Sequence, residues 1–386
     1  MKAKKWIQKI LILLFICFSL VLSINYIVDP YGLYKLHIFN IPKIKQADKM
    51  RLIKIISVQE IKPTSICLGT SRAESGYDPN HKYFIKPSYN FGISSSSMYE
   101  ARLNFEWALA QGNLEKVLLV ADYIMFNSKK QKEIQDFETY FKHINSISKY
   151  KYLFSIDTLL DSIITMRGNS SPAILYYNNG QRVHNYSQRI VDEKGGHKSL
   201  FIKNEYEYFK DYLTNYRYKD TKSSSFEDFE KIIQLCYENN IKLDIIFGPS
   251  HIRLWESLNY YLGYEKWLQW KKDVVISVNK ISRNYNKQQF RVIDFSIYHF
   301  LTNETIPDDK NLKMKYYWES SHYKNKLGLI VLDKLIGKDD FHNFGIELNI
   351  NNIDVHLKKL SIAREDFINI KLYQKEVWGE SSNNNK

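Results

Sequence analysis

The stretch Lys-Val-Leu-Leu-Val-Ala at residues 116–121, with its unbroken apolar core, constrains the fold of this chain more than any other feature. Its valines and leucines do not alternate with polar residues, which is typical of a parallel strand buried on both faces. Similar short runs at 65–68, 88–91, 242–247 and 290–295 alternate with helical patterns. The sequence therefore predicts an α/β domain with a mostly parallel sheet and right-handed crossovers.

Helices are predicted wherever apolar residues recur at helical spacing between these strands. The predicted ranges are 49–60, 98–109, 226–239, 264–285 and 322–336. In such sheets, functional sites form at the carboxyl ends of the strands. Ser71, Gly92 and Asp122 follow the first three predicted strands, and His251 follows the fourth. We therefore expect these residues along one edge of the sheet.

The N-terminal segment is strongly apolar after a basic flank, Met-Lys-Ala-Lys-Lys. Residues 6–28 are long enough to cross a bilayer of ~30 Å at ~1.5 Å per residue. The lysines indicate that the first residues stay in the cytoplasm. A cleaved signal peptide is the alternative, but no Ala-x-Ala-like site follows the apolar run. We expect an uncleaved, single-pass anchor in a bacterial cell membrane, with the rest of the chain outside the cytoplasm.

The composition of the sequence divides the chain into three parts. Residues 1–30 are expected to form a cytoplasmic stub and the anchor, and residues 31–375 the α/β domain. The pattern is interrupted at 127–224, where a polar, Tyr-rich stretch predicts an insertion, and 376–386 reads as a flexible tail. The tyrosines of the insertion could stack on sugar rings, but aromatic residues that fill a small core are the favoured interpretation.

Charge and cysteine content narrow the classes of partner. Lys and Arg outnumber Asp and Glu by 55 to 42, which gives a net charge of +13. The lysines are dispersed, so we expect mild attraction to anionic membrane or wall polymers and no binding of nucleic acid. The three cysteines form no Cys-x-x-Cys or Cys/His cluster, so neither a metal site nor a disulfide framework is indicated. No cofactor is expected.

Three residues have the chemistry of a serine nucleophile site. Ser71 ends the run Ser-Ile-Cys-Leu-Gly-Thr-Ser, and Trp-Glu-Ser-Ser-His-Tyr supplies Glu319 and His322. A serine hydroxyl needs a base within hydrogen-bond reach, and a carboxylate can fix the tautomer of that base. We therefore predict Ser71 as nucleophile, His322 as base and Glu319 as the residue that orients it. The backbone N–H groups of Ser71 and Gly92 are the predicted donors to the oxyanion.

Each element also has a simpler interpretation. A Gly-Thr-Ser turn after a strand is common, and Glu-x-x-His alone would more often belong to the start of a helix. Gly92 could be an ordinary loop glycine, and Asp122 could cap the following helix. His251 is interpreted as a surface turn residue. The prediction of a site therefore rests on the order and placement of these residues together.

That combination resembles the SGNH/GDSL-like hydrolase superfamily over roughly residues 60–336. The first block of the family is matched by Gly69-Thr70-Ser71-Arg72, the second by Gly92 in Tyr-Asn-Phe-Gly, and the last by Glu319-Ser-Ser-His322. The apolar anchor followed by Asp-Pro-Tyr-Gly is similar to a membrane-anchored bacterial branch, related to alginate O-acetyltransferase and lipoteichoic-acid D-alanylation proteins. A flavodoxin-like three-layer sandwich is the expected architecture.

One block departs from the family. Its third block is Gly-x-Asn, whose Asn side chain completes the oxyanion hole. The equivalent strand end here reads Ala-Asp-Tyr-Ile-Met-Phe-Asn, with Asp122 and, further on, Asn127. An ionised Asp122 would repel an oxyanion, and Asn127 remains a further candidate donor if its loop is suitable.

The resemblance implies a serine acyl-esterase or O-acyltransferase that acts on a cell-surface glycan, with acetyl as the expected acyl group. A membrane acyl exporter is an implied partner. The alternative is a non-catalytic, SGNH-like module that binds glycan or assists assembly of a polysaccharide system, which the missing Gly-x-Asn would favour. The sequence leaves the choice between esterase and transferase open.

Overall fold

The computed structural model describes residues 2–34, 43, 45–127, 149–168, 175–209, 215–338, 340–367, 371–372 and 374–377. Residues 378–386 of the predicted tail, and residues 128–148, 169–174 and 210–214 of the predicted insertion, lie outside these residues. The chain forms two compact units, Met1–Glu60 with Gln135–Tyr177, and Ile61–Ile134 with Asn178–Lys386. The segment predicted as one insertion thus contributes residues to both units.

The larger unit is built on a six-stranded sheet in the order β2-β1-β3-β4-β5-β6. The strands are β1 (Ser65–Leu68), β2 (Ser88–Asn90), β3 (Lys116–Val120), β4 (Lys242–Phe247), β5 (Arg291–Asp294) and β6 (Ile346–Leu348). The first five pair in parallel, and β6 pairs antiparallel with β5. The prediction of a mixed α/β fold with a mostly parallel sheet is confirmed. The edge strand β6 was not predicted, because three residues carry too little periodicity.

Burial explains why the central strands could be read from the sequence. Every residue of β1 is buried, as are the last four residues of β3 and all of β4 after Lys242. Side chains on both faces of these strands are covered, so no polar alternation survives in their sequence. The central strands therefore hold the core and fix the edge at which their carboxyl ends meet.

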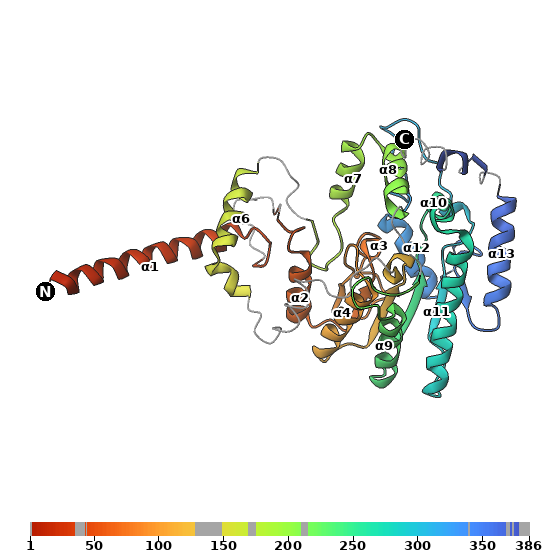
Figure 1. Cartoon of the computed structure of the whole chain (residues 1–386), viewed down its shortest axis with the longest axis horizontal. Helices are drawn as coiled ribbons and strands as arrows, with labels where there is room; N and C mark the ends of the chain where they lie inside the picture. The colour runs from red at the N-terminus through yellow and green to blue at the C-terminus, as the bar shows by residue number, and fades with distance from the viewer. Residues whose placement is uncertain are drawn as a thin grey trace. The chain divides into compact units, whose positions relative to one another are not determined.

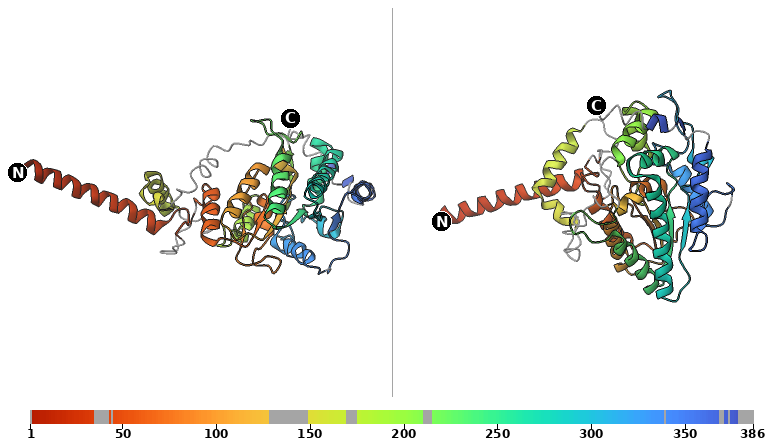
Figure 2. Two further views of the ribbon diagram at one scale, coloured as in Figure 1. Left: turned by 90° about the horizontal axis from the view of Figure 1, so that it is seen from below. Right: turned by 45° about the vertical axis from the view of Figure 1, so that its right-hand side comes forward.

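Helices flank this sheet in the larger unit. They are α3 (Ser71–Gly76), α4 (Met98–Ala110), α7 (His184–Glu193), α8 (His197–Phe209), α9 (Ser225–Glu238), α10 (Ile252–Leu262), α11 (Tyr264–Asn284), α12 (Asn325–Leu335) and α13 (Ile353–Asp366). Short 3-10 helices are η2 (Tyr123–Phe126) and η5 (Phe300–Thr302). Helix α9 packs against α4 and α11, and α8 packs against α10 (Figures 1 and 2). The last helix near the site begins at Asn325, three residues later than predicted.

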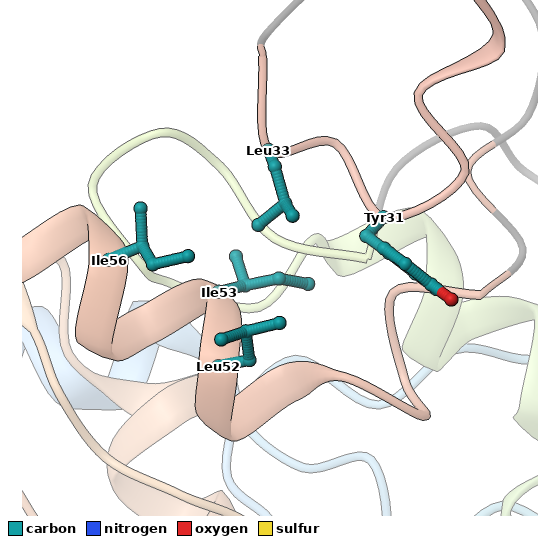
Figure 3. Packing of buried hydrophobic residues seen from close by; sticks show 5 residues of the cluster. All are labelled: Tyr31, Leu33, Leu52, Ile53 and Ile56. Carbon is teal, nitrogen blue, oxygen red and sulfur yellow. The ribbon is translucent and has the colours of Figure 1, made fainter. Parts of the chain in front are cut away.

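The smaller unit contains the N-terminal helix α1 (Lys2–Val28), α2 (Met50–Ile61, of which all but Ile61 belong to this unit), η4 (Lys149–Phe154) and α6 (Ile156–Arg167). Helix α1 is long and apolar enough to span a membrane or act as a signal anchor. Its end packs against η4 and α6. A small hydrophobic cluster follows the helix, formed by Tyr31, Leu33, Leu52, Ile53 and Ile56 (Figure 3).

Candidate active site

The turn after β1 places Ser71 at the carboxyl edge of the sheet. Gly69 has φ +146°, and a Cβ there would lie 2.9 Å from both the Ala73 Cβ and the Val120 carbonyl oxygen. Only glycine allows the chain to turn this close to the neighbouring strand. Thr70 then caps α3, its hydroxyl oxygen accepting from the Arg72 N–H at 3.3 Å. Ser71 is the first residue of the helix and its N–H makes no hydrogen bond within the described residues.

A tight loop between Trp318 and Tyr323 carries the other two residues. Tyr317 and Tyr323 form an isolated antiparallel bridge, and the Trp318 N–H donates to the His322 carbonyl at 2.9 Å. Glu319 and His322 therefore lie on a hairpin-like loop. The predicted helical start at residue 322 is wrong, because these backbone groups are already paired within the loop. Ser320 and Ser321 lie within this loop, and the N-cap residue of the next helix is Lys324.

The structure brings Ser71, His322 and Glu319 together in one chain of hydrogen bonds. The Ser71 Oγ lies 2.6 Å from the His322 Nε2, and the His322 Nδ1 is in close contact with the Glu319 Oε1. The backbone N–H groups of His322 and Ser321 each donate to the Glu319 carboxylate at 2.8 Å. With Nδ1–H donating to the carboxylate, Nε2 is left to accept from the serine hydroxyl, which is the tautomer a general base requires.

Glu319 is kept ionised by its surroundings. Its side chain is only 3 % exposed, and burial alone would raise its pKa. Attraction to His322 and hydrogen bonds from His322, the Ser321 N–H and the Asn204 side chain outweigh burial and lower the pKa of Glu319 to about 2. A carboxylate that stays charged at neutral pH can hold the imidazole in place and stabilise it when it gains a proton.

Arg72 and Asp122 form a buried ion pair beside these residues. The Arg72 Nη1 lies 2.6 Å from the Asp122 Oδ1, and the Thr70 hydroxyl donates to the other carboxylate oxygen. The Arg72 Nε also donates to the Ser321 Oγ at 3.0 Å. Arg72 thereby joins the helix that begins at Ser71 to the loop that holds Glu319 and His322. We call these four residues (Thr70, Arg72, Asp122, Ser321) the clamp.

The clamp was not predicted from the sequence. Asp122 was recognised as the residue at the third strand end, but its negative charge was expected to face an oxyanion. In the structure that charge is neutralised by Arg72, which immediately follows Ser71. The Gly-Thr-Ser-Arg quartet contained the signal, since a buried arginine in the first turn after a strand requires an anionic partner. The sequence did not show that the partner is Asp122, which lies 50 residues further along the chain.

The two other predicted oxyanion donors lie in less open positions. The Gly92 N–H donates to the Asn90 Oδ1 at 3.1 Å, so a substrate oxygen would have to share it. A Cβ at Gly92 would lie 2.9 Å from the Ala73 Cβ, which shows how closely this loop approaches α3. Asn127 is buried directly after η2. Within the described part of the chain it makes no hydrogen bond to Ser71, and its predicted role, like that of Gly92, stays a prediction.

A pocket of about 290 Å³ opens beside His322 and Glu319, on the side formed by α7 and α8. Its apolar wall includes Ile190, Leu200 and Trp318, which pack together with Val191. Lys194 and Lys203 line it as well, and neither ammonium has an ion-pair partner among the residues that the structure describes. A pocket with an aromatic wall and free cations suits a sugar or acyl group next to an anionic substituent.

His251 is buried, which corrects its interpretation as a surface residue. It caps the start of α10, with its Nδ1 accepting from the Arg253 N–H at 3.2 Å, and its Nε2 donates to the Glu304 carbonyl at 2.9 Å. Burial lowers the pKa of His251 to about 3, so the ring stays neutral and fixed in one tautomer. His251 therefore holds structure together and does not compete with His322.

Comparison with known proteins adds little to this picture. No family model matches the chain, and no curated protein matches it. A solved structure from Streptococcus pneumonia, provisionally described as a platelet activating factor, is similar at 11% sequence identity and a TM-score of 0.33. The match covers 76% of this chain and 94% of that chain. A TM-score this low carries no argument, so the interpretation of the site depends on its own geometry.

Proposed function

We propose that this protein is a membrane-anchored serine acyl-ester enzyme whose nucleophile is Ser71. The observation that carries the proposal is the continuous path from the Ser71 Oγ through His322 to Glu319, with 2.6 Å between the Oγ and the Nε2. The residues come from segments about 250 positions apart, and chance packing seldom produces this order of nucleophile, base and orienting acid.

The chemistry follows from the protonation states. As the Ser71 Oγ bonds to the acyl carbon, its proton passes to the His322 Nε2, and Glu319 stabilises the imidazolium. The ester C–O bond then breaks, and the departing alcohol takes the proton from His322. Water or a sugar hydroxyl next gives its proton to His322 and attacks the acyl-serine, which releases the acid or the new ester and restores Ser71. Water makes the enzyme an esterase, and a sugar hydroxyl makes it a transferase.

The oxyanion would be held first by the Ser71 N–H, which is unpaired within the described chain. Gly92 would contribute its N–H by sharing it with Asn90, and Asn127 stays a further candidate. A hole with few free donors predicts modest catalysis, because each oxyanion donor contributes roughly 10²–10³ in rate.

The substrate proposed for this site is an acyl ester, with acetyl as the first candidate, on a cell-surface glycan. The pocket beside His322 supports this choice, since Ile190, Leu200 and Trp318 line it on one side and Lys194 and Lys203 add cations. Location of the larger unit outside the cytoplasm is proposed from the lysines in the first turns of α1. A membrane acyl exporter would then be the partner that supplies the acyl group.

The proposal extends to the fold. The order of the first five strands, 2-1-3-4-5, is that of flavodoxin-like sheets, which supports a flavodoxin-like three-layer sandwich. Ser71, Gly92 and Asp122 follow β1, β2 and β3 at the carboxyl edge. This placement supports the SGNH/GDSL-like interpretation of the larger unit.

The test uses the full-length chain in detergent with 4-nitrophenyl acetate and a fluorophosphonate probe. We expect the wild type to release 4-nitrophenol and to be labelled at Ser71, and Ser71→Ala and His322→Ala to lose both activities. Ser88→Ala is the matched control, because the Ser88 hydroxyl is buried at the opposite end of β2 and donates to the Pro79 carbonyl. Equal rates in the wild type and Ser71→Ala would contradict the proposal.

A second candidate is a non-catalytic module that binds glycan. It is favoured by the engaged Gly92 N–H and by Asp122 in the place of an oxyanion-holding Asn. In that case the wild type would be inert to both reagents and yet bind glycan oligomers. Loss of glycan binding on substitution of Trp318, with no labelling of Ser71 in the wild type, would support this candidate over the enzyme.

A further inference from the structure

Helix α6 has an inverted distribution of polar and apolar residues. Its buried residues are Thr158, Ser162 and Thr165, which are small and polar. Ile156, Leu160 and Ile164, spaced four apart on one face, are 71%, 55% and 47% exposed. A helix on the surface of a soluble protein shows the reverse pattern, with apolar residues facing the core. The exposed face of α6 therefore does not suit water.

The polar face of α6 is held by specific contacts. The Ser162 hydroxyl donates to the Asn25 Oδ1 at 3.1 Å, and the Tyr31 hydroxyl donates to the Asp161 carboxylate at 2.6 Å. The Asn25 amide donates in turn to the backbone carbonyls of Leu153 and Ser155, each at 3.0 Å. These bonds set the rotation of α6 about its own axis. Its apolar face is consequently fixed outward.

The outward face continues the apolar surface of α1. Phe154, at the end of η4, is 45% exposed and its ring stacks on Phe18 of α1 with centroids 4.9 Å apart. Phe18 itself is 53% exposed, in the middle of the apolar part of the helix. Figure 1 shows α6 lying across the end of α1. The exposed apolar residues of α1, η4 and α6 thus form one surface within this unit, with the charged Lys151, Asp157 and Arg167 exposed beside them.

The depths of these residues agree with a membrane interface. Asn25 lies seven residues after Phe18, which is roughly 10 Å along a helix axis. Interfacial helices bury their apolar face roughly 5–10 Å into the boundary between headgroups and acyl chains. If the polar Asn25 marks the edge of the hydrocarbon, Phe154 reaches this depth beside Phe18. The cationic side chains of Lys151 in η4 and Arg167 at the end of α6 are exposed and could then reach the headgroups.

We propose that α6 and the end of η4 form a second membrane contact, an in-plane helix whose apolar face (Phe154, Ile156, Leu160, Ile164) lies in the bilayer interface next to α1. The occupant of this face is lipid. The argument for lipid is continuity, because Phe154 packs directly on the segment that is apolar enough to cross a bilayer. This inference is independent of the activity proposed for Ser71.

The test places a fluorophore at single positions of the full chain in lipid nanodiscs. Leu160→Cys and Ile164→Cys, each made in a Cys17→Ser background, are labelled with an NBD dye. Lys266→Cys is the matched control, because Lys266 is an exposed residue on a helix of the larger unit. Doxyl-labelled lipids quench dyes within the bilayer, and aqueous iodide quenches dyes in water.

We expect positions 160 and 164 to lose fluorescence to doxyl lipids and to resist iodide, with the opposite result at position 266. Quenching of 160 and 164 by iodide alone would overturn the proposal, because the face would then be in water. Resistance to both quenchers would also overturn it, because protein, from this chain or a second copy, would then cover the face. The substitutions are at exposed positions, and two sites guard against a local defect at either one.

Discussion

Two Arg–Asp ion pairs lie at opposite edges of the same sheet. At the carboxyl edge, Arg72 pairs with Asp122 at 2.6 Å. At the amino edge, Arg291 makes a bidentate pair with Asp244, with both contacts at 2.8 Å. Each carboxylate also accepts from a neighbouring hydroxyl, Thr70 in the first pair and Tyr83 in the second. The chemical parts are therefore the same.

The two pairs differ in what lies next to them. The Arg291 guanidinium reaches the Leu335 carbonyl at the end of α12, so its pair ties strands and a helix together. The Arg72 guanidinium reaches Ser321, whose N–H holds the Glu319 carboxylate. The same kind of ion pair thus stabilises the fold at the amino edge and positions side chains at the carboxyl edge. The two pairs differ in role because they lie at different edges and because the arginine contacts a third group of a different kind, the Leu335 carbonyl or Ser321.

The substitution with the largest expected effect, Ser71→Ala, tests whether the carboxyl edge of the sheet holds a catalytic site. Ser71→Ala should reduce ester turnover by roughly 10⁴-fold or more, because the nucleophile is lost. Asp244→Asn at the amino edge should leave turnover within about twofold while it lowers the thermal midpoint. Turnover of 4-nitrophenyl acetate and a thermal melt on each variant make the check. Similar losses of turnover in both variants would remove the distinction between the edges.

Asp122→Asn should lower kcat/KM by roughly 10–100-fold, because a hydrogen bond to a charged group contributes roughly 1.5–3 kcal/mol. The loss should appear in kcat more than in KM if the clamp positions His322 and Glu319. An increase in kcat would carry a different meaning. If Asp122 instead repels the oxyanion, the same substitution would raise kcat. Asp244→Asn is the isosteric control at the other edge.

A double-mutant cycle asks whether Arg72 and Asp122 act as one unit. Arg72→Gln alone should cost about as much activity as Arg72→Gln with Asp122→Asn, because the second substitution removes a partner already lost. Coupling of about 1–3 kcal/mol in the activation free energy is expected. Additive losses would show that the two residues act separately. The matching cycle on Arg291 and Asp244 should show coupling in unfolding free energy but little in activation free energy.

Acid should lower the stability of the folded state through protonation of Glu319. Its pKa is held at about 2 in the folded chain against an ordinary value of 4.5. The folded state therefore gains stability from Glu319 above pH 4.5, and loses it as the pH falls toward 2. Glu319→Gln should reduce this part of the acid dependence of the thermal midpoint. A wild-type slope between pH 5 and pH 3 that the substitution leaves unchanged would contradict the assignment.

The smallest expected effect concerns the pocket. Lys194→Gln with Lys203→Gln should raise KM for an anionic acetylated glycan by about two- to fivefold, because exposed charges contribute roughly 0–1 kcal/mol each. KM for neutral 4-nitrophenyl acetate should not change. Added salt should reduce the difference between wild type and variant. Equal changes for both substrates would indicate altered folding of α7 and α8 and not a lost charge contact.

The parallel strands of the sheet could be predicted from the sequence, but the ion pairs at its edges could not. β3 could be predicted because its burial on both faces leaves an unbroken apolar run. The proximity of Ser71 and His322 could be predicted because their residue types and order suit one reaction, while their roles stay predictions. The clamp could not be predicted, since pairing of Arg72 with Asp122 depends on the register of β1 and β3. The hairpin that holds Glu319 and His322 depends on long-range packing and not on local spacing. In α6 the sequence shows the spacing of Ile156, Leu160 and Ile164, but it does not show which face of the helix is covered by protein.

The hydrogen bonds of Asn25 have a consequence for any bilayer that α1 crosses. Because its amide is bonded to three carbonyls between Tyr152 and Ser155, the last turn of the helix cannot slide or rotate relative to that segment. A bilayer thicker or thinner than the apolar length must then be matched at the other end, where Lys4, Lys5 and Lys9 can extend their long side chains toward the headgroups. The protein would meet hydrophobic mismatch at the N-terminal end of α1 alone.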